Sequence, residues 1–151
     1  MEEWTMKYFL KLNAASLLYA LLAVLPLELM LNVYRITRLS GWEIETVNAL
    51  TAIFFFINLI GGTLLFFRLT EKWLGGRKLN YITSILWFPY FILFVFLFAT
   101  LLPITYRGDD PSPVTGLLMM FGIIVYPVYI LILTNLSMLG DSKKTMPIKN
   151  P

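Results

Sequence analysis

A carboxylate, an amide and a guanidinium lie in register near the end of the first apolar segment. Glu28, Asn32 and Arg35 stand at i, i+4 and i+7, so a helix would place them on one face. If that segment is centred between Lys11 and Arg35, Glu28 lies about 7 Å past its midpoint at 1.5 Å per residue. Pro26 lacks an N–H and would loosen the helix beside the acid. The spacing predicts a polar ladder that opens outward from a membrane.

This ladder has two interpretations. A charge at the centre of a membrane helix costs roughly 2.5–3.5 kcal/mol, and less near the interface. Because of this cost, an acid at this depth is a candidate functional residue. The functional interpretation is a site that binds a proton or a cation, or a charge that pairs with a partner subunit. The structural interpretation is a carboxylate that reaches toward the interface and is satisfied by Asn32 or Arg35.

A second polar line follows the next apolar segment. Its members recur in steps of three and four and therefore share one stripe of a helix: Asn48, Thr51, Phe55, Asn58 and Gly62. Asn58 lies near the middle of the segment, where an amide needs a partner, and Gly61 and Gly62 allow a second helix to approach closely. Helix packing is the favoured role, and a substrate-facing line of amides is the alternative. Glu28 and Asn58 would join if the first two helices enclosed one outward-facing cleft.

Several chemistries have no residues to support them. The chain contains no cysteine and no histidine, which excludes thiol–disulfide exchange, haem ligation by either residue, an ordinary zinc site and histidine-dependent phosphatase chemistry. Asp109 and Asp110 are the remaining catalytic option, but they adjoin Pro111 in a turn. We expect them to cap a helix or to form a solvated acidic loop. No enzymatic activity, cofactor or metal is therefore expected.

The elements that carry these residues follow from the hydropathy. Of 151 residues, 58% are hydrophobic and 14% are charged, whereas a soluble domain carries about 25% charged residues. Four apolar blocks are each long enough to cross about 30 Å of hydrocarbon as a helix. We predict helices over residues 8–33, 43–70, 80–102 and 113–139. The fold class is an all-α integral membrane four-helix bundle without a soluble domain, spanning residues 1–139 and followed by a disordered basic tail, 140–151.

Local signals support these boundaries. Ser40 and Glu43 have the spacing of a capping box, which would start the second helix by Gly41. Glycines at 75–76 and 140 are suited to ending the second and fourth helices. The run Asp110-Pro111-Ser112-Pro113 offers two caps, each followed by a proline suited to the first position of the fourth helix.

Lysines and arginines set the expected orientation. Nine flank the same side of the four segments: Lys7, Lys11, Arg68, Lys72, Arg77, Lys78, Lys143, Lys144 and Lys149. The other side holds three, which are Arg35, Arg38 and Arg107. Because the richer side is normally cytoplasmic, both termini are predicted to lie in the cytoplasm.

The basic loops predict contact with anionic lipid at the cytoplasmic face. Topology already accounts for them, so no nucleic-acid partner is expected. The expected function is that of an accessory, regulatory or immunity-type subunit in a bacterial plasma membrane, acting through helix contacts with a membrane-protein partner or with its own copies. The alternative is a small oligomeric transporter or channel, coupled to protons or cations, that uses Glu28 and Asn58.

Overall fold

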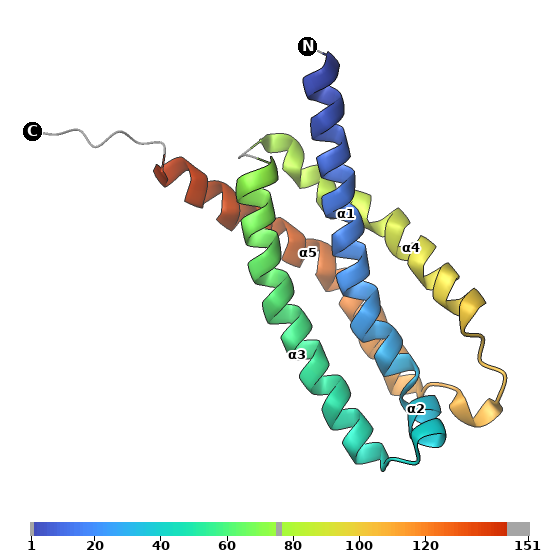
Figure 1. Cartoon of the computed structure of the whole chain (residues 1–151). Helices are drawn as coiled ribbons and strands as arrows, with labels where there is room; N and C mark the ends of the chain where they lie inside the picture. The colour runs from blue at the N-terminus through green and yellow to red at the C-terminus, as the bar shows by residue number, and fades with distance from the viewer. Residues whose placement is uncertain (1, 75–76, 145–151) are drawn as a thin grey trace, which may run out of the picture.

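The computed structural model describes residues 2–74 and 77–144, and helix is the only regular structure in that part of the chain (Figure 1). Its α-helices are α1 (Glu2–Leu31), α2 (Val33–Ser40), α3 (Ile44–Leu69), α4 (Thr83–Leu101) and α5 (Pro113–Lys144). Shorter pieces are a π-helical segment, η1 (Thr70–Leu74), and two 3-10 segments, η2 (Lys78–Ile82) and η3 (Arg107–Asp109).

Within the described residues, four helical spans are long and apolar enough to cross a membrane: Met6–Leu31, Ile44–Leu74, Lys78–Leu101 and Pro113–Met138. Helix suits such segments because it pairs every backbone N–H and C=O that lipid cannot hydrate. The all-α expectation is confirmed for this part of the chain. The predicted stop at residues 75–76 and the tail over 145–151 lie outside the described residues.

The long helices run alternately up and down (Figure 1). The start of α1, the segments η1 and η2 and the end of α5 lie at one end, which we call the terminal end. The helix α2, the start of α3 and η3 lie at the opposite end, which we call the α2 end. The α2 end holds the residues that hydropathy assigned to the two less basic loops.

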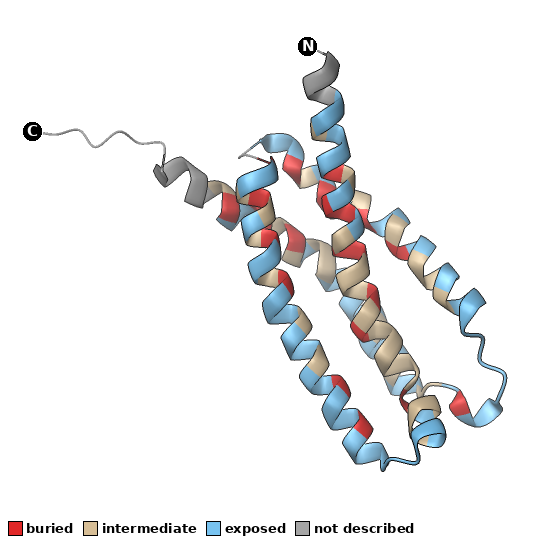
Figure 2. Cartoon of the chain, viewed as in Figure 1, coloured by how far each residue is buried: buried red, intermediate tan, exposed pale blue. Residues whose placement is uncertain are grey.

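The core forms around α1. Tyr19, Ala20 and Val24 of this helix are buried against residues from all three other long helices: Phe66, Trp87, Phe91, Ile130 and Leu133. The rings of Tyr19 and Phe66 stack with their centroids 3.6 Å apart, and this contact joins α1 to α3. In the most apolar stretch of the α1 span 33% of residues are buried, against 17% for the α3 span and 11% for α5. The outer helices therefore present most of their apolar surface outward (Figure 2).

The first helix does not end at residue 33, as the sequence suggested. The chain kinks at Asn32, where the side-chain amide bonds back to the Glu28 carbonyl at 2.9 Å, and continues as α2 to Ser40. Gly41 then ends α2 with φ +71°, a left-handed conformation that glycine adopts without a Cβ clash.

The predicted capping box is also wrong. Glu43 is the N-cap of α3 but its side chain makes no capping bond. Ser40 instead belongs to the end of α2, where its hydroxyl donates to the Ile36 carbonyl at 2.6 Å.

The start of α5 is as predicted, and its end is not. Ser112 Oγ accepts the Thr115 N–H at 3.3 Å, which is N-cap geometry with Pro113 in the first helical position. At the other end α5 passes through Gly140 to Lys144, so the first residues of the predicted tail are helical. A single interior glycine costs only about 1 kcal/mol relative to alanine, which does not by itself stop a helix.

The two glycines of α3 have different surroundings. Gly62 is buried, and a Cβ built on it would lie 3.1 Å from Leu22 Cδ1 of α1. Gly61 is exposed, and a Cβ there would meet nothing within 4 Å. Of the two predicted packing glycines, only Gly62 lies at a close helix contact.

We expect Gly62→Leu to destabilise the protein by about 1–3 kcal/mol, because the added side chain must push α1 and α3 apart. Gly61→Leu is the matched control, with the same gain in helix propensity but a side chain directed into open space. Thermal unfolding in detergent micelles, followed by circular dichroism, measures both. Equal shifts in the two variants would contradict the assigned contact.

Candidate functional site

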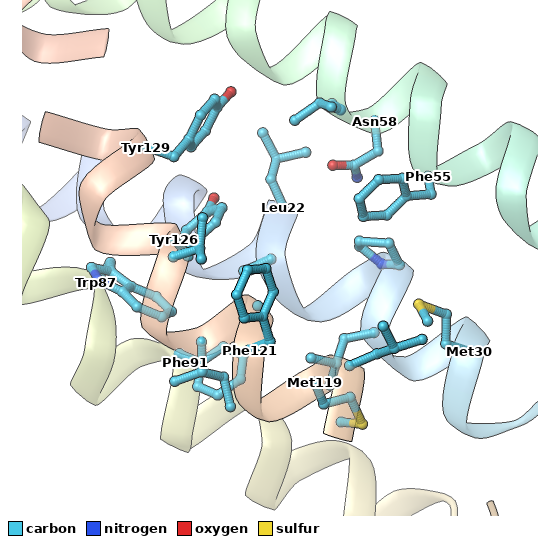
Figure 3. A pocket seen from close by; sticks show the side chains of 18 residues that line it. Leu22, Met30, Phe55, Asn58, Trp87, Phe91, Met119, Phe121, Tyr126 and Tyr129 are labelled. Atoms are coloured by element: carbon cyan, nitrogen blue, oxygen red, sulfur yellow. The ribbon is translucent and has the colours of Figure 1, made fainter. Parts of the chain in front are cut away.

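A cavity of about 430 Å³ lies among the four long helices, and 18 residues line it (Figure 3). We call it the inner cavity. Leu22, Pro26 and Met30 come from α1, Phe55 and Asn58 from α3, and Trp87 and Phe91 from α4. The helix α5 contributes the largest share, including Met119, Phe121, Tyr126 and Tyr129. The lining is therefore almost wholly apolar and aromatic.

The polar groups that line the inner cavity differ in whether they have a hydrogen-bond partner. The Tyr126 hydroxyl donates to the Tyr19 carbonyl at 2.8 Å, and the Tyr129 hydroxyl lies 2.7 Å from Thr63 Oγ1. Trp87 Nε1 donates to the Ser84 carbonyl at 3.0 Å. The half-buried Asn58 amide has no hydrogen-bond partner anywhere in the described chain, and Figure 3 shows it projecting from α3 beside Phe55. Asn58 is thus the one polar group of this lining that is left for a ligand, as far as the described residues go.

A second cavity of about 400 Å³, the outer cavity, lies toward the α2 end. Its polar side chains are Tyr34, Asn48, Thr51, Ser112 and Thr115. The two cavities share Met30, Phe55 and Leu118, so they adjoin across three apolar side chains. No charged residue of the described chain lines either one.

The predicted polar stripe of α3 runs along both cavities. Asn48 and Thr51 line the outer cavity, and Asn58 lines the inner one. Asn48 is exposed and Thr51 is buried. The spacing in the sequence therefore identified a real line of polar groups, although the cavities beside it became visible only in the fold.

The predicted ladder forms at the kink between α1 and α2. Asn32 Nδ2 lies 3.5 Å from Glu28 Oε2, and Arg35 Nη1 lies 3.5 Å from Asn32 Oδ1. Glu28 is half-buried and lines neither cavity. Glu28 therefore lines no cavity in common with Asn58 in the described chain. The kink and the continuing α2 give the acid partners of its own, away from α3.

Arg35 also makes hydrogen bonds to the end of α4, which the sequence did not predict. Its guanidinium donates to the carbonyls of Leu102 at 3.0 Å and Pro103 at 2.9 Å. These carbonyls follow the last turn of α4, where backbone acceptors lack helical partners. Arg35 thereby caps α4 and ties it to α2.

Asp109 is not the solvated or capping residue that the sequence suggested. Arg38 donates to both of its carboxylate oxygens, at 2.9 and 2.7 Å, and the Asp109 side chain is only 2% exposed. The Arg38 guanidinium also lies 4.9 Å from the centre of the Tyr106 ring. Hydrogen bonds from Arg38 lower the pKa of Asp109 below its ordinary value of 3.8. The partners are 71 positions apart, so no local pattern could have paired them.

A scan against protein-family models found no match to this chain, and searches of curated proteins and of solved structures found none.

We expect Asp109→Asn to lower the thermal midpoint at neutral pH, because it leaves the Arg38 guanidinium without its charged partner. The native pair stabilises the fold fully above the ordinary carboxylate pKa, since the pKa is depressed in the folded state. That contribution is lost as the pH falls through the folded-state pKa.

Asp110→Asn, at the exposed neighbour, is the matched control. Thermal midpoints measured from neutral to acidic pH should converge for wild type and Asp109→Asn and stay parallel for wild type and the control. A constant gap between wild type and Asp109→Asn would contradict the ion pair.

Proposed function

We propose that this protein acts without catalysis, as a membrane-embedded subunit that binds a hydrophobic molecule in the inner cavity. The observation that carries the proposal is Asn58, an amide in the middle of an apolar span that lines the cavity without a hydrogen-bond partner in the described chain. An unpaired amide is costly in a medium without water. A ligand with an apolar body and one hydrogen-bonding group would remove that cost.

The inner cavity, at about 430 Å³, has the size of a small-molecule site. It lies within the usual range for ligand pockets, about 300–1,000 Å³.

The lining supports binding and not chemistry. Among the described residues it holds no carboxylate, amine or guanidinium, and its tyrosine and tryptophan donors already have partners. A proton-coupled transporter based on Glu28 and Asn58 has less support, because the acid lies outside the cavity.

The second part of the proposal is that the protein, with a molecule bound in the inner cavity, acts as a regulatory or accessory subunit of a membrane partner. The outward faces of α3 and α5 carry large exposed apolar side chains, for example Ile57 and Ile124. Lipid or the helices of a membrane partner, including further copies of this chain, would cover such faces. A molecule bound between α3 and α5 would set their separation and so the shape offered to that partner.

We also propose a plasma-membrane location, in a bacterium, with both termini in the cytoplasm, on the strength of the lysine and arginine distribution. Because the chain has no cysteine, each introduced cysteine is a unique label site. Ser40→Cys at the α2 end should react with an impermeant maleimide in intact cells. Lys78→Cys at the terminal end should react only after lysis. The reverse pattern would overturn the orientation.

The binding proposal is tested through Trp87, which lines the inner cavity. A protein with Trp4, Trp42 and Trp73 changed to phenylalanine would report from this residue alone. In lipid nanodiscs, a brominated hydrocarbon chain with a mid-chain hydroxyl should quench Trp87 at lower mole fraction than the same chain without the hydroxyl. We expect a roughly three- to tenfold preference, the value of one intramembrane hydrogen bond of about 0.6–1.4 kcal/mol.

Asn58→Leu should remove that preference. Ile57→Ala, at the adjacent lipid-facing position, should keep it. Equal quenching by both chains in the unsubstituted Trp87 reporter would overturn the proposed site.

A further inference from the structure

The lining becomes more polar from the inner cavity to the outer cavity. The inner cavity is apolar apart from Asn58 and a few internally bonded groups, whereas the outer cavity carries amide and hydroxyl groups. Met30, Phe55 and Leu118 belong to both linings, so the two spaces meet at apolar side chains. The combined space is apolar within the bundle and polar toward the α2 end. This is the profile of an amphiphile.

We infer that the ligand is a single-chain amphiphile whose uncharged, hydroxyl-bearing head lies in the outer cavity and whose chain lies in the inner cavity. The inference rests on the proposed function, because it assumes that the inner cavity is occupied. It adds the chemical class of the ligand and the direction in which it lies.

The geometry of α3 sets the spacing of the polar groups on this ligand. Thr51 and Asn58 are seven residues apart, which is two helical turns on one stripe and about 10 Å of rise. A head that contacts Thr51 therefore places the chain atom that reaches Asn58 about 10 Å deeper. A hydrogen-bonding group in mid-chain would satisfy the unpaired amide.

The charges around the outer cavity favour a head without charge. No charged side chain in the described residues lines it, so a phosphate would find no guanidinium or amine. The two nearby arginines are engaged, Arg35 with the carbonyls that follow α4 and Arg38 with Asp109. The exposed acids Glu43 and Glu45 at the start of α3 would repel an anion.

The groups that do line the outer cavity suit hydroxyls. Ser112 Oγ and Thr115 Oγ1 lie 3.0 Å apart and bond to each other, so one of the two hydroxyls keeps its O–H for a further acceptor. Because Ser112 Oγ also accepts the Thr115 N–H, it is Thr115 Oγ1 that keeps a lone pair for a further donor. The exposed Asn48 amide offers two donors and an acceptor with no partner in the described chain. A glycerol or sugar head can both donate to and accept from such a set.

The size of the inner cavity favours one chain. At about 430 Å³ it lies toward the lower end of the range for ligand pockets, about 300–1,000 Å³, which leaves little room for a second chain beside the first.

The test uses the Trp87 reporter in nanodiscs with three probes. All carry one brominated acyl chain with a mid-chain hydroxyl, and they differ in the head: glycerol, phosphoglycerol or phosphocholine. We expect the glycerol probe to quench Trp87 at roughly tenfold lower mole fraction than either charged head, the factor that corresponds to about 1.4 kcal/mol. The double variant Asn48→Leu, Thr51→Val should remove this head preference. It should keep the preference for the mid-chain hydroxyl that depends on Asn58.

Other outcomes separate the two proposals. If all three heads quench equally while Asn58→Leu still removes the hydroxyl preference, the head site is wrong and the inner-cavity proposal stands. If a phosphate-bearing head is preferred, the charge argument is wrong. If neither the head nor the mid-chain hydroxyl matters, both proposals fail. Asn48→Ser, which keeps a hydrogen-bonding side chain, should retain the head preference and guards against a folding defect in the double variant.

Discussion

The ion pair between Arg38 and Asp109 holds the α2 end together. It bridges α2 and η3 with two hydrogen bonds, 2.9 and 2.7 Å long, and Asp109 is almost fully covered. The chain leaves η3 and enters α5 four residues later. Arg35, one turn earlier in α2, ties the end of α4 to the same short helix. Two arginines thus tie α2 to η3 and to the end of α4.

The terminal end is held by different forces. There the Tyr19 ring stacks on Phe66, and tyrosine hydroxyls donate to asparagine side chains across the helices: Tyr8 to Asn80 at 2.7 Å, Tyr81 to Asn135 at 2.6 Å and Tyr90 to Asn13 at 2.6 Å. Each bond pairs a phenol with an amide where lipid or the core would otherwise leave both unsatisfied. These three bonds satisfy the phenols, but Asn80 Nδ2 is buried without a partner, and the amides of Asn58 and Asn48 have none in the described chain.

With the bundle fastened at both ends, its middle stays open on the side of α3 and α5. The spans of these helices are 17% and 11% buried in their most apolar stretches, and the two cavities lie between them and α1. Close contact between α1 and α3 occurs at Gly62, one turn beyond Asn58 toward the terminal end. A bundle of this kind can admit a chain from the bilayer without losing its core around α1.

The sequence by itself determined the class of the fold, because a run of some 20 apolar residues must become a helix to pair its backbone in lipid. It also determined the polar stripe of α3, since helical periodicity fixes which residues share a face. Only the tertiary structure decided that α1 continues through a kink into α2, that Arg38 finds Asp109, and that Glu28 lies apart from Asn58. These outcomes depend on contacts between residues far apart in the chain and on the direction of one bend. Local sequence predicts neither the distant contacts nor the bend. The segment of α2 that carries Arg38 was predicted as loop, and nothing in the sequence around Asp109 indicates that Arg38 is its partner.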